Sequence, residues 1–309
     1  MNKRCIGCGK ILQDQDKSSE GYTPNLKNEY CMRCFRLKNY GEKKEGEIVL
    51  EKDILTRVNK GKGIAFFLVD FLNINQETIH LFNEIKLPKI LVISKSDILR
   101  REMNQDKIRI WLDQVYQVDK VLFISNKPSF KSNNIFKIME EYNTYTAYIM
   151  GLTNAGKSTF LNKLLKEAGI KKEILASNKP NTTLDFIKIK IGEYTIFDTP
   201  GFSYQNDSLA LLNKEIKPIS YQIKPNTRLI INDLELFFKE ENKVIFYGST
   251  KIERKYQETP QLVYKINVSA NQDIVLPGIG FLNVKNACQI LSNEQELETR
   301  IDISEVKYE

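Results

Sequence analysis

The stretch with the clearest chemical signature runs Gly151-Leu-Thr-Asn-Ala-Gly-Lys157-Ser158. An apolar, β-prone run from 144 to 150 precedes it, and residues 159–165 have the apolar spacing of a helix. A strand that passes through a glycine loop into a helix N-terminus presents backbone N–H groups to an anion. Lys157 can reach the β- and γ-phosphates, and the Ser158 hydroxyl can ligate Mg²⁺. A chance glycine turn is the alternative, and the flanking strand and helix favour a phosphate site. Its predicted members are Asn154, Ala155, Gly156, Lys157, Ser158 and Thr159.

A second chemical signal lies in the cysteines near the N-terminus. Cys5 and Cys8 form one Cys-x-x-Cys pair, and Cys31 and Cys34 form another after 22 intervening residues. Four thiolates at this spacing can surround one tetrahedral Zn²⁺, while two disulfides or a redox pair are the alternatives. No strand–helix pattern surrounds either pair, which favours zinc. Residues 1–45 are therefore expected to be a zinc-binding module whose folding energy comes mostly from the metal.

Length and composition limit the class of protein. The 309 residues suffice for two or three compact units, and 41% of them are apolar, as in ordinary globular chains. No run approaches the roughly 18 apolar residues of a membrane span, and the first residues lack the apolar segment of a signal peptide. We therefore expect a cytoplasmic protein without membrane contact.

Charge is distributed unevenly along the chain. The net charge is +7, yet residues 206–309 carry 13 basic and 15 acidic side chains. The basic front half suggests an anionic partner such as RNA, although most charged side chains are simply solvated. Residues 35–40 interleave aromatic and basic side chains. They could face RNA or merely join two domains.

From Ile64 onward, apolar runs alternate with helical stretches. Strands are predicted at 64–70, 89–94 and 121–125, and helices at about 76–86, 105–117 and 133–142. Continuous apolar strands between helices indicate a parallel sheet covered on both faces. Ligands of such sheets bind at the carboxyl ends of the strands. The polar residues expected there are Ser94, Lys95 and Asp97 after the second strand, and Ser125, Asn126 and Lys127 after the third.

The glycine loop is followed by further polar signals. Thr182 and Thr183 precede a predicted strand at 184–191, and a strand at 194–198 leads into Asp198-Thr-Pro-Gly201. These pieces resemble the sequence boxes of a GTPase of the translation-factor class. The two boxes that normally come last in such a chain, here at residues 94–97 and 125–127, come before the glycine loop. That order is typical of circularly permuted GTPases.

A four-cysteine module ahead of a permuted GTPase domain resembles the bacterial YqeH family, which takes part in small ribosomal subunit assembly. The resemblance is strong over residues 1 to about 205 and weaker through 223–225 and 277–280. It implies that Asp97 reads the guanine edge and that the stem of Lys95 packs over the base. Ser94 replaces the usual asparagine, and the loop Ser125-Asn126-Lys127 departs from the usual Ser-Ala-Lys.

The resemblance also assigns roles around the phosphates. Asp198 would hold Mg²⁺ through a water, and the Gly201 N–H would sense the γ-phosphate. Thr182 or Thr183 would close over Mg²⁺ and the γ-phosphate. Phe202 stands where related proteins carry a glutamine that orients the attacking water.

Asn154 occupies the loop position that binds K⁺ in related GTPases lacking that glutamine; alternatively, it only stabilises the loop. The catalytic set implied by the resemblance is Asn154, Lys157, Thr183 and Gly201. The expected metal ligands are Cys5, Cys8, Cys31 and Cys34 for Zn²⁺, Ser158, Thr183 and Asp198 for Mg²⁺, and Asn154 for K⁺.

We therefore predict an α/β fold, a circularly permuted P-loop GTPase domain (46–205) between the zinc module (1–45) and a small β-rich interaction domain (206–309). Pro218 and Pro225 are expected to mark the linker, and a helix or charged tail to end the chain. The predicted activity is Mg²⁺-dependent, K⁺-stimulated hydrolysis of GTP to GDP by a monomer. The expected partners are the small ribosomal subunit or its precursor and rRNA. An RNA-binding scaffold with a nearly inactive GTPase domain and a switch that controls another protein are the alternatives.

Overall fold

The computed structural model describes residues 3–5, 10–15, 21–31, 51–94, 105–124, 134–153, 155–169, 186–202, 218–248, 250–256 and 262–306. The chain divides into two compact units. Met1–Leu68, Glu84–Ile90 and Lys131–Ser203 make the first, and Val69–Asn83, Leu91–Phe130 and Tyr204–Glu309 make the second.

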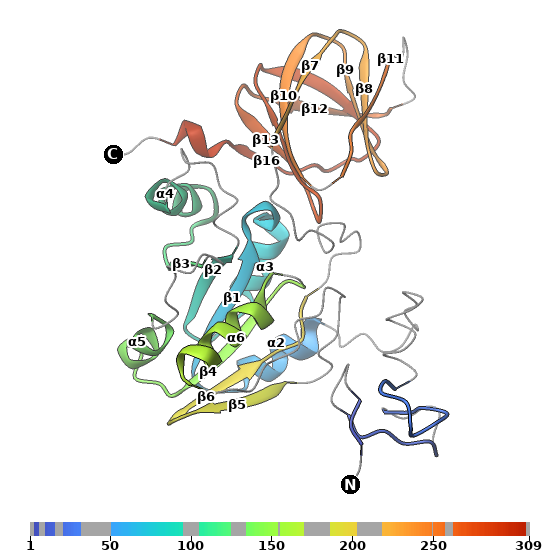
Figure 1. The fold of residues 1–309 in the computed structure, drawn as a ribbon. Helices are drawn as coiled ribbons and strands as arrows, with labels where there is room; N and C mark the ends of the chain where they lie inside the picture. The colour runs from blue at the N-terminus through green and yellow to red at the C-terminus, as the bar shows by residue number, and fades with distance from the viewer. Residues whose placement is uncertain are drawn as a thin grey trace. The chain divides into compact units, whose positions relative to one another are not determined.

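A six-stranded sheet runs in the order β3-β2-β1-β4-β6-β5. Its strands are β1 (Ile64–Asp70), β2 (Lys89–Ser94), β3 (Val121–Phe123), β4 (Thr146–Gly151), β5 (Ile187–Ile191) and β6 (Tyr194–Asp198). Strand β4, which leads into the glycine loop, lies between β1 and β6 (Figure 1). The strands before β4 in the chain lie on one side of it and those after it on the other, which is the arrangement a permuted chain produces.

The sheet is mixed rather than wholly parallel. β1 pairs with β4, β4 with β6 and β2 with β3 in parallel, as expected for strands joined by helices. β5 pairs with β6 antiparallel. Only Gly192 and Glu193 separate β5 from β6, and Gly192 has a φ of +58°. So short a connection permits only an antiparallel pair.

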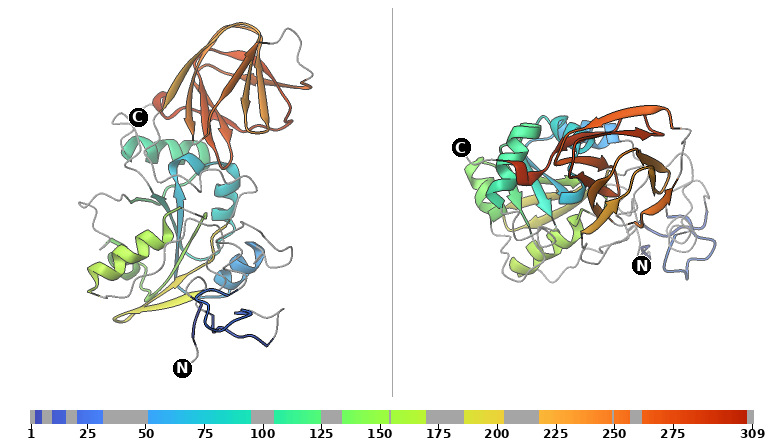
Figure 2. Two further views of the ribbon diagram at one scale, coloured as in Figure 1. Left: turned by 45° about the vertical axis from the view of Figure 1, so that its right-hand side comes forward. Right: turned by 90° about the horizontal axis from the view of Figure 1, so that it is seen from above.

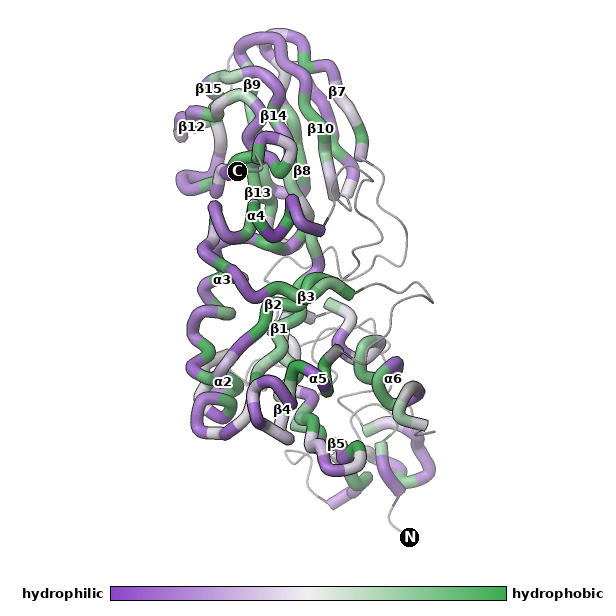
Figure 3. The backbone as a smooth tube through the Cα atoms, turned by 90° about the vertical axis from the view of Figure 1, so that its left-hand side faces the viewer, coloured by the Kyte–Doolittle hydropathy of each residue, from purple (hydrophilic) through white to green (hydrophobic). Residues whose placement is uncertain are grey.

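The central strands confirm the prediction made from continuous apolar runs. All seven residues of β1 are buried, as in a strand covered on both faces. β1 and β2 are largely green in the hydropathy view (Figure 3). The predicted bounds of both strands match the structure, whereas β3 ends two residues earlier than expected.

Helices occur where the apolar spacing predicts them. The three predicted helices are α3 (Gln76–Asn83), α4 (Gln105–Tyr116) and α5 (Asn134–Glu141). α6 (Lys157–Glu167) begins at the lysine of the glycine loop and continues beyond the predicted end. A further helix, α2 (Glu51–Asn59), was not predicted.

The C-terminal region is rich in β-strands, as its sequence predicts, and these strands form two sheets. The two antiparallel sheets have the orders β16-β13-β14-β10-β7 and β11-β8-β9-β15-β12. Figure 2 shows this region in orange and red in two further views. The strands are β7 (Ile219–Ile223), β8 (Thr227–Ile231), β9 (Leu234–Phe238), β10 (Asn242–Gly248), β11 (Glu253–Tyr256), β12 (Tyr264–Val268), β13 (Gln272–Leu276), β14 (Gly280–Val284), β15 (Cys288–Ser292) and β16 (Thr299–Ile301).

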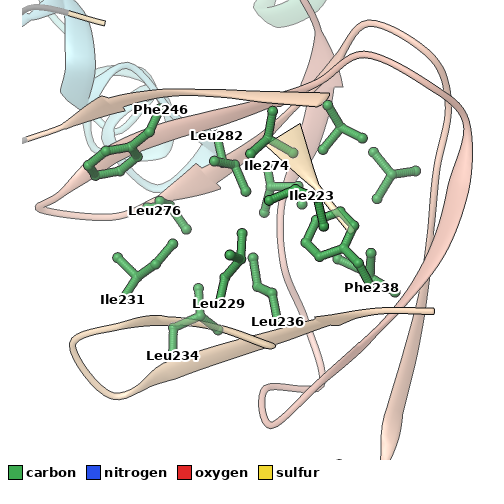
Figure 4. Close-up of a cluster of buried hydrophobic side chains, with 14 of the residues drawn as sticks. Ile223, Leu229, Ile231, Leu234, Leu236, Phe238, Phe246, Ile274, Leu276 and Leu282 are labelled. Carbon is green, nitrogen blue, oxygen red and sulfur yellow. The ribbon is translucent and has the colours of Figure 1, made fainter. Parts of the chain in front are cut away.

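Two expectations for this region are wrong. The segment after β14 forms β15 and β16 rather than a helix, because β15 pairs on both edges, with β9 and with β12. Pro225 lies in the turn between β7 and β8 and not in a linker. Leu229 and Leu236 from one sheet pack with Ile274 and Leu282 from the other in a shared apolar core (Figure 4).

Arg300 on β16 joins the C-terminal sheets to α4 and to the segment after β1, all within the second compact unit. Its guanidinium donates to the Ile74 carbonyl oxygen and to the Tyr116 hydroxyl at 3.1 Å. The guanidinium carbon lies 4.9 Å from the ring centroid of Trp111. The Arg300 Nε lies 3.5 Å from an oxygen of Asp273. Both charged side chains are at most 5% exposed.

Neighbouring hydrogen bonds extend the same contact. The Trp111 Nε1–H donates to the Ile301 carbonyl oxygen at 2.9 Å. Glu298 accepts from the Tyr116 hydroxyl at 2.7 Å and from the Gln76 backbone N–H at 2.8 Å. The last strand of the C-terminal region and the residue before it are therefore held by partly buried polar contacts on α4 and by an exposed one at the start of α3.

Candidate functional site

The glycine loop begins where the backbone of β4 passes against β1. Gly151 has a φ of +129°, and a Cβ placed on it would lie 2.0 Å from the Leu68 carbonyl oxygen. The Leu152 N–H donates to that same oxygen at 3.1 Å. Any side chain at 151 would therefore displace the loop from the sheet.

The loop ends at the first turn of α6. Gly156 precedes the helix with a φ of +86°, a left-handed conformation that favours glycine. As the residue before the helix, Gly156 has no side chain that could cap it. The first backbone N–H groups of a helix have no partner within the helix, and the helix dipole favours negative charge at this point, so this end of the loop suits an anion.

Lys157 lies along the loop that it closes. Its Nζ donates to the Gly151 carbonyl oxygen at 3.0 Å and to the Leu152 carbonyl oxygen at 2.8 Å. Burial lowers the pKa of Lys157 to about 8, and the charge of Asp198 acts against this shift. A phosphate group would favour the charged form of the lysine and raise its pKa again. The buried lysine therefore favours binding of a strongly negative ligand at this loop.

Asp198 ends β6 and is 1% exposed. Burial raises the pKa of Asp198 to about 6, while the charge of Lys157 lowers it. Within the described ranges the Oδ1 atom of Asp198 accepts no hydrogen bond although it is buried. A buried carboxylate oxygen without a donor is costly unless a cation satisfies it. Asp198 therefore fits a Mg²⁺ site, to which the half-buried Ser158 on α6 could add a hydroxyl ligand.

Gly201 and Phe202 contact this loop through their backbones. A Cβ on Gly201 would lie 2.8 Å from the Lys157 Nζ, so only glycine fits without moving the lysine. Phe202 forms an isolated parallel bridge with Leu152. Its ring is buried and stacks on Phe67 with 5.8 Å between the centroids. The backbone of Phe202 thus borders the loop while its side chain points into the core, and its ring cannot orient a water.

Among the residues predicted to lie near the guanine base, the structure describes Ser94, which ends β2. Ser94 is 3% exposed, and its hydroxyl donates to the Val69 carbonyl oxygen at 3.4 Å. The shorter side chain therefore contacts the end of the strand β1. The other residues predicted to contact the base lie outside the described residues: Lys95, Asp97, Ser125, Asn126 and Lys127. The same holds for Asn154 of the glycine loop, for Thr182 and Thr183, and for Cys8 and Cys34 of the predicted zinc site.

The two described cysteines of the N-terminal pairs lie together. Cys5 and Cys31 are each 2% exposed, and the Cys31 N–H donates to the Cys5 Sγ at 3.2 Å. An N–H directed at a sulfur stabilises a thiolate, which is the form that binds zinc. The described ranges contain no group of three or more potential metal ligands. The pair fits half of a four-cysteine site, and zinc binding stays a prediction.

Sequence reasoning missed one residue of the loop. Thr153 donates to the Phe202 carbonyl oxygen from both its N–H and its hydroxyl. The only available signal was a hydroxyl residue inside the glycine loop, which does not reveal a partner 49 residues away.

Across the described parts of the chain, no helix combines the length and the apolar character needed to cross a membrane.

Comparisons with known proteins agree with this geometry. A family model described as RsgA GTPase matches residues 72–206, and one described as 50S ribosome-binding GTPase matches residues 146–269. The first range contains the predicted base loops ahead of the glycine loop. The second begins at the first residue of β4, the strand before the glycine loop.

Two relatives and one solved structure illustrate the similarity. The chain is 29% identical over 260 residues to the uncharacterized protein YqeH of Bacillus subtilis (strain 168), covering 75% of this chain and 71% of that protein. A protein of Oryza sativa subsp. japonica named putative nitric oxide synthase is 26% identical over 268 residues, covering 73% of this chain. The chain spans about half of the rice protein, 48% of its length. YjeQ from Thermotoga maritima has 22% identity and a TM-score of 0.33 over 46% of this chain and 49% of that one, and the assignment does not rest on it.

The strand order and the relatives lead to one assignment. The strands before β4 in the chain lie beyond β1 in the sheet, and the glycine loop, Lys157 and Asp198 are packed together as a phosphate site requires. The chain is a circularly permuted GTPase of the YqeH and RsgA type.

Proposed function

We propose that the chain binds GTP and hydrolyses it to GDP and phosphate in a Mg²⁺-dependent reaction. The observation that carries this proposal is the packing of Lys157, Asp198 and Gly201 around one loop, with a buried carboxylate oxygen that accepts no hydrogen bond from the described residues. Lys157 would neutralise phosphate charge, and the Gly201 N–H would donate to the terminal phosphate. Ser158, Asp198 and the predicted Thr183 would hold Mg²⁺, which stabilises negative charge on the phosphates when bound.

Catalysis would rely on position and charge. The Phe202 ring is buried against Phe67, so the position usually occupied by a water-orienting glutamine offers only backbone atoms. We propose that Asn154 helps to hold a K⁺ ion near the phosphates, where it would supply positive charge. Guanine would be selected by the predicted contact of Asp97 with the base edge, with Lys95 packed over the ring.

We further propose that the chain acts on a ribosomal subunit during assembly, and on the small subunit in particular. The resemblance of the permuted domain and its cysteine module to the YqeH family supports the choice of the small subunit. The match to a family of 50S ribosome-binding GTPases supports a ribosomal partner but not that choice, because 50S is the large subunit. The basic balance of the first 205 residues suits rRNA. A zinc module at residues 1–45 would add a second surface for that partner.

Two measurements test the proposal. Single-turnover hydrolysis of GTP should require Mg²⁺ and should not occur with ATP. A protein that binds GTP but does not hydrolyse it, alone or with ribosomal subunits, would favour the RNA-binding scaffold instead.

Co-sedimentation with purified small and large subunits should show binding to the small subunit that depends on whether GDP or a non-hydrolysable GTP analogue is present. Binding to the large subunit alone would contradict the choice of subunit. Binding to neither would favour a switch that controls another protein.

A further inference from the structure

The Phe202 carbonyl oxygen accepts two hydrogen bonds from a single residue of the glycine loop. The Thr153 N–H donates to it at 2.7 Å, and the Thr153 hydroxyl donates to it at 2.9 Å. Thr153 is 9% exposed and Phe202 is 1% exposed, so water does not compete strongly for this oxygen. Two donors on one buried carbonyl hold the orientation of its peptide group.

The same short segment is held at two further points. The Phe202 N–H donates to the Gly151 carbonyl oxygen at 3.2 Å, which also accepts from the Lys157 Nζ. The Phe202 ring stacks on Phe67. The residue that follows Gly201 is therefore attached to the loop by its N–H and its carbonyl group, and to the core by its ring.

Thr153 also lies against Gly201 itself. A Cβ on Gly201 would be 3.0 Å from the Thr153 hydroxyl oxygen and 2.8 Å from the Lys157 Nζ. Both side chains therefore lie close to the Gly201 backbone, on the side where a Cβ would stand. The Phe202 carbonyl lies two peptide groups after the Gly201 N–H, so a change in its orientation would be transmitted to this backbone through Phe202.

The two hydrogen bonds to Phe202 differ in what they require of the sequence. Any residue other than proline at position 153 can supply the N–H donor. Only threonine or serine can supply the hydroxyl in this place while keeping a side chain of this size. The hydroxyl bond is therefore the part of the contact that is particular to this chain.

We propose that the Thr153 hydroxyl is a positioning group for GTP hydrolysis, because it fixes the Phe202 carbonyl and with it the Gly201 N–H that would face the terminal phosphate. This inference rests on the proposed GTPase activity and adds a residue to it. GDP lacks the terminal phosphate, so loss of the hydroxyl should slow hydrolysis without weakening GDP binding.

The test compares Thr153→Val, which keeps the shape of the side chain, with Thr153→Ser, which keeps the hydroxyl. Single-turnover hydrolysis is measured at saturating Mg²⁺–GTP, and GDP affinity is measured with a fluorescent GDP analogue. We expect hydrolysis by Thr153→Val to be about tenfold slower, the effect of one hydrogen bond, with GDP affinity unchanged within about twofold. Thr153→Ser should hydrolyse GTP within about threefold of the wild-type rate.

A matched control separates positioning from general stability. Thr227 is another buried threonine, and its hydroxyl donates to the Lys224 carbonyl oxygen at 2.7 Å in the C-terminal region. Thr227→Val should lower thermal stability and leave the hydrolysis rate unchanged.

Three results would overturn the positioning role: wild-type hydrolysis by Thr153→Val, an equal loss of GDP affinity and rate, or a Thr153→Ser as slow as the valine variant. A wild-type protein that does not hydrolyse GTP would instead remove the proposed function, and this inference with it.

Discussion

Replacing Arg300 by methionine should destabilise the second compact unit by an amount that grows with pH. The substitution keeps a long side chain between Trp111 and Phe281 but removes the charge that faces Asp273. Removing one partner of a buried ion pair costs about 3–5 kcal/mol, because the other charge stays buried without compensation. In Arg300→Met the remaining charge, the Asp273 carboxylate, can avoid that cost by taking up a proton. The destabilisation therefore depends on pH.

The size of the pH effect follows from Asp273. Burial raises its pKa from 3.8 to about 6, and the charge of Arg300 acts against this shift. The folded state thus binds this proton more tightly than the unfolded state, so the stability from Asp273 is complete below about pH 4 and is lost as pH rises to about 6. In the wild type this loss of stability ends at about pH 6, because the charge of Arg300 allows the Asp273 carboxylate to ionise in the folded state.

In Arg300→Met the folded-state pKa of Asp273 rises further, and the loss continues at about 1.4 kcal/mol per pH unit. At pH 8, two units above the wild-type value, the extra destabilisation from this source is about 2.7 kcal/mol. At pH 5 it is close to zero, because the carboxyl is protonated in both folded proteins. Loss of the hydrogen bonds to Ile74 and Tyr116 adds about 1–3 kcal/mol at either pH.

The assay is urea unfolding at pH 5 and pH 8, followed by the fluorescence of Trp111, the single tryptophan of the chain. Its ring borders Arg300 and its Nε1–H donates to Ile301, so its emission reports on this contact directly. Arg254→Met is the matched control, because Arg254 is exposed and lies over the Tyr221 ring at 5.3 Å. It should cost less than about 1 kcal/mol at both pH values. Equal destabilisation by Arg300→Met at pH 5 and pH 8 would refute the reasoning, as would persistence of the pH effect after Asp273→Asn is added.

Four further predictions concern the site. Protein purified without chelators should contain one Zn²⁺ per chain, and Cys31→Ser should unfold the N-terminal module while nucleotide binding persists; elemental analysis without zinc would contradict this. Asp97→Asn should shift preference from GTP toward xanthosine triphosphate, and equally tight ATP binding by the wild type would exclude the guanine contact. Hydrolysis should be on the order of 10²-fold faster in KCl than in NaCl at equal ionic strength, a preference that Asn154→Ala abolishes; equal rates in both salts rule out the K⁺ role. Because burial raises the pKa of Asp198 to about 6, Mg²⁺-dependent GTP affinity should rise about tenfold from pH 5 to pH 7, and the same profile in Asp198→Asn would exclude that carboxylate.

The sequence predicts elements well where burial is continuous. β1 and β2 are covered on both faces, so all of their residues are apolar except Asp70, Lys89 and Ser94 at the strand ends, and their bounds follow directly. In the C-terminal sheets the burial often alternates, as in β8, where every second residue is buried. Strands such as β9 and β15 are five residues long, and Glu235 and Gln289 interrupt their apolar residues, so their pattern is weak.

In the candidate site, features that are local in the sequence could be predicted, whereas contacts between distant residues could not. Lys157 and the glycines are neighbours in sequence, so the motif alone places the lysine on its own loop. Thr153 and Phe202 are 49 residues apart, and Trp111 and Ile301 are 190 residues apart. Such contacts depend on strand register and on the packing of separate elements, which no local pattern in one sequence specifies.

The distance along the chain between Arg300 and its partners has a consequence for biosynthesis. Ribosomes add about 5–20 residues per second, so Trp111 leaves the peptidyl-transferase centre roughly 10–40 seconds before the strand that covers it. During that interval the apolar surface of Phe71 and Trp111 lacks the Phe281 and Arg300 side chains that pack on it in the finished protein. The nascent chain would be prone to aggregation at this surface, and chaperones that bind exposed aromatic segments would be expected to act on it before β16 is synthesised.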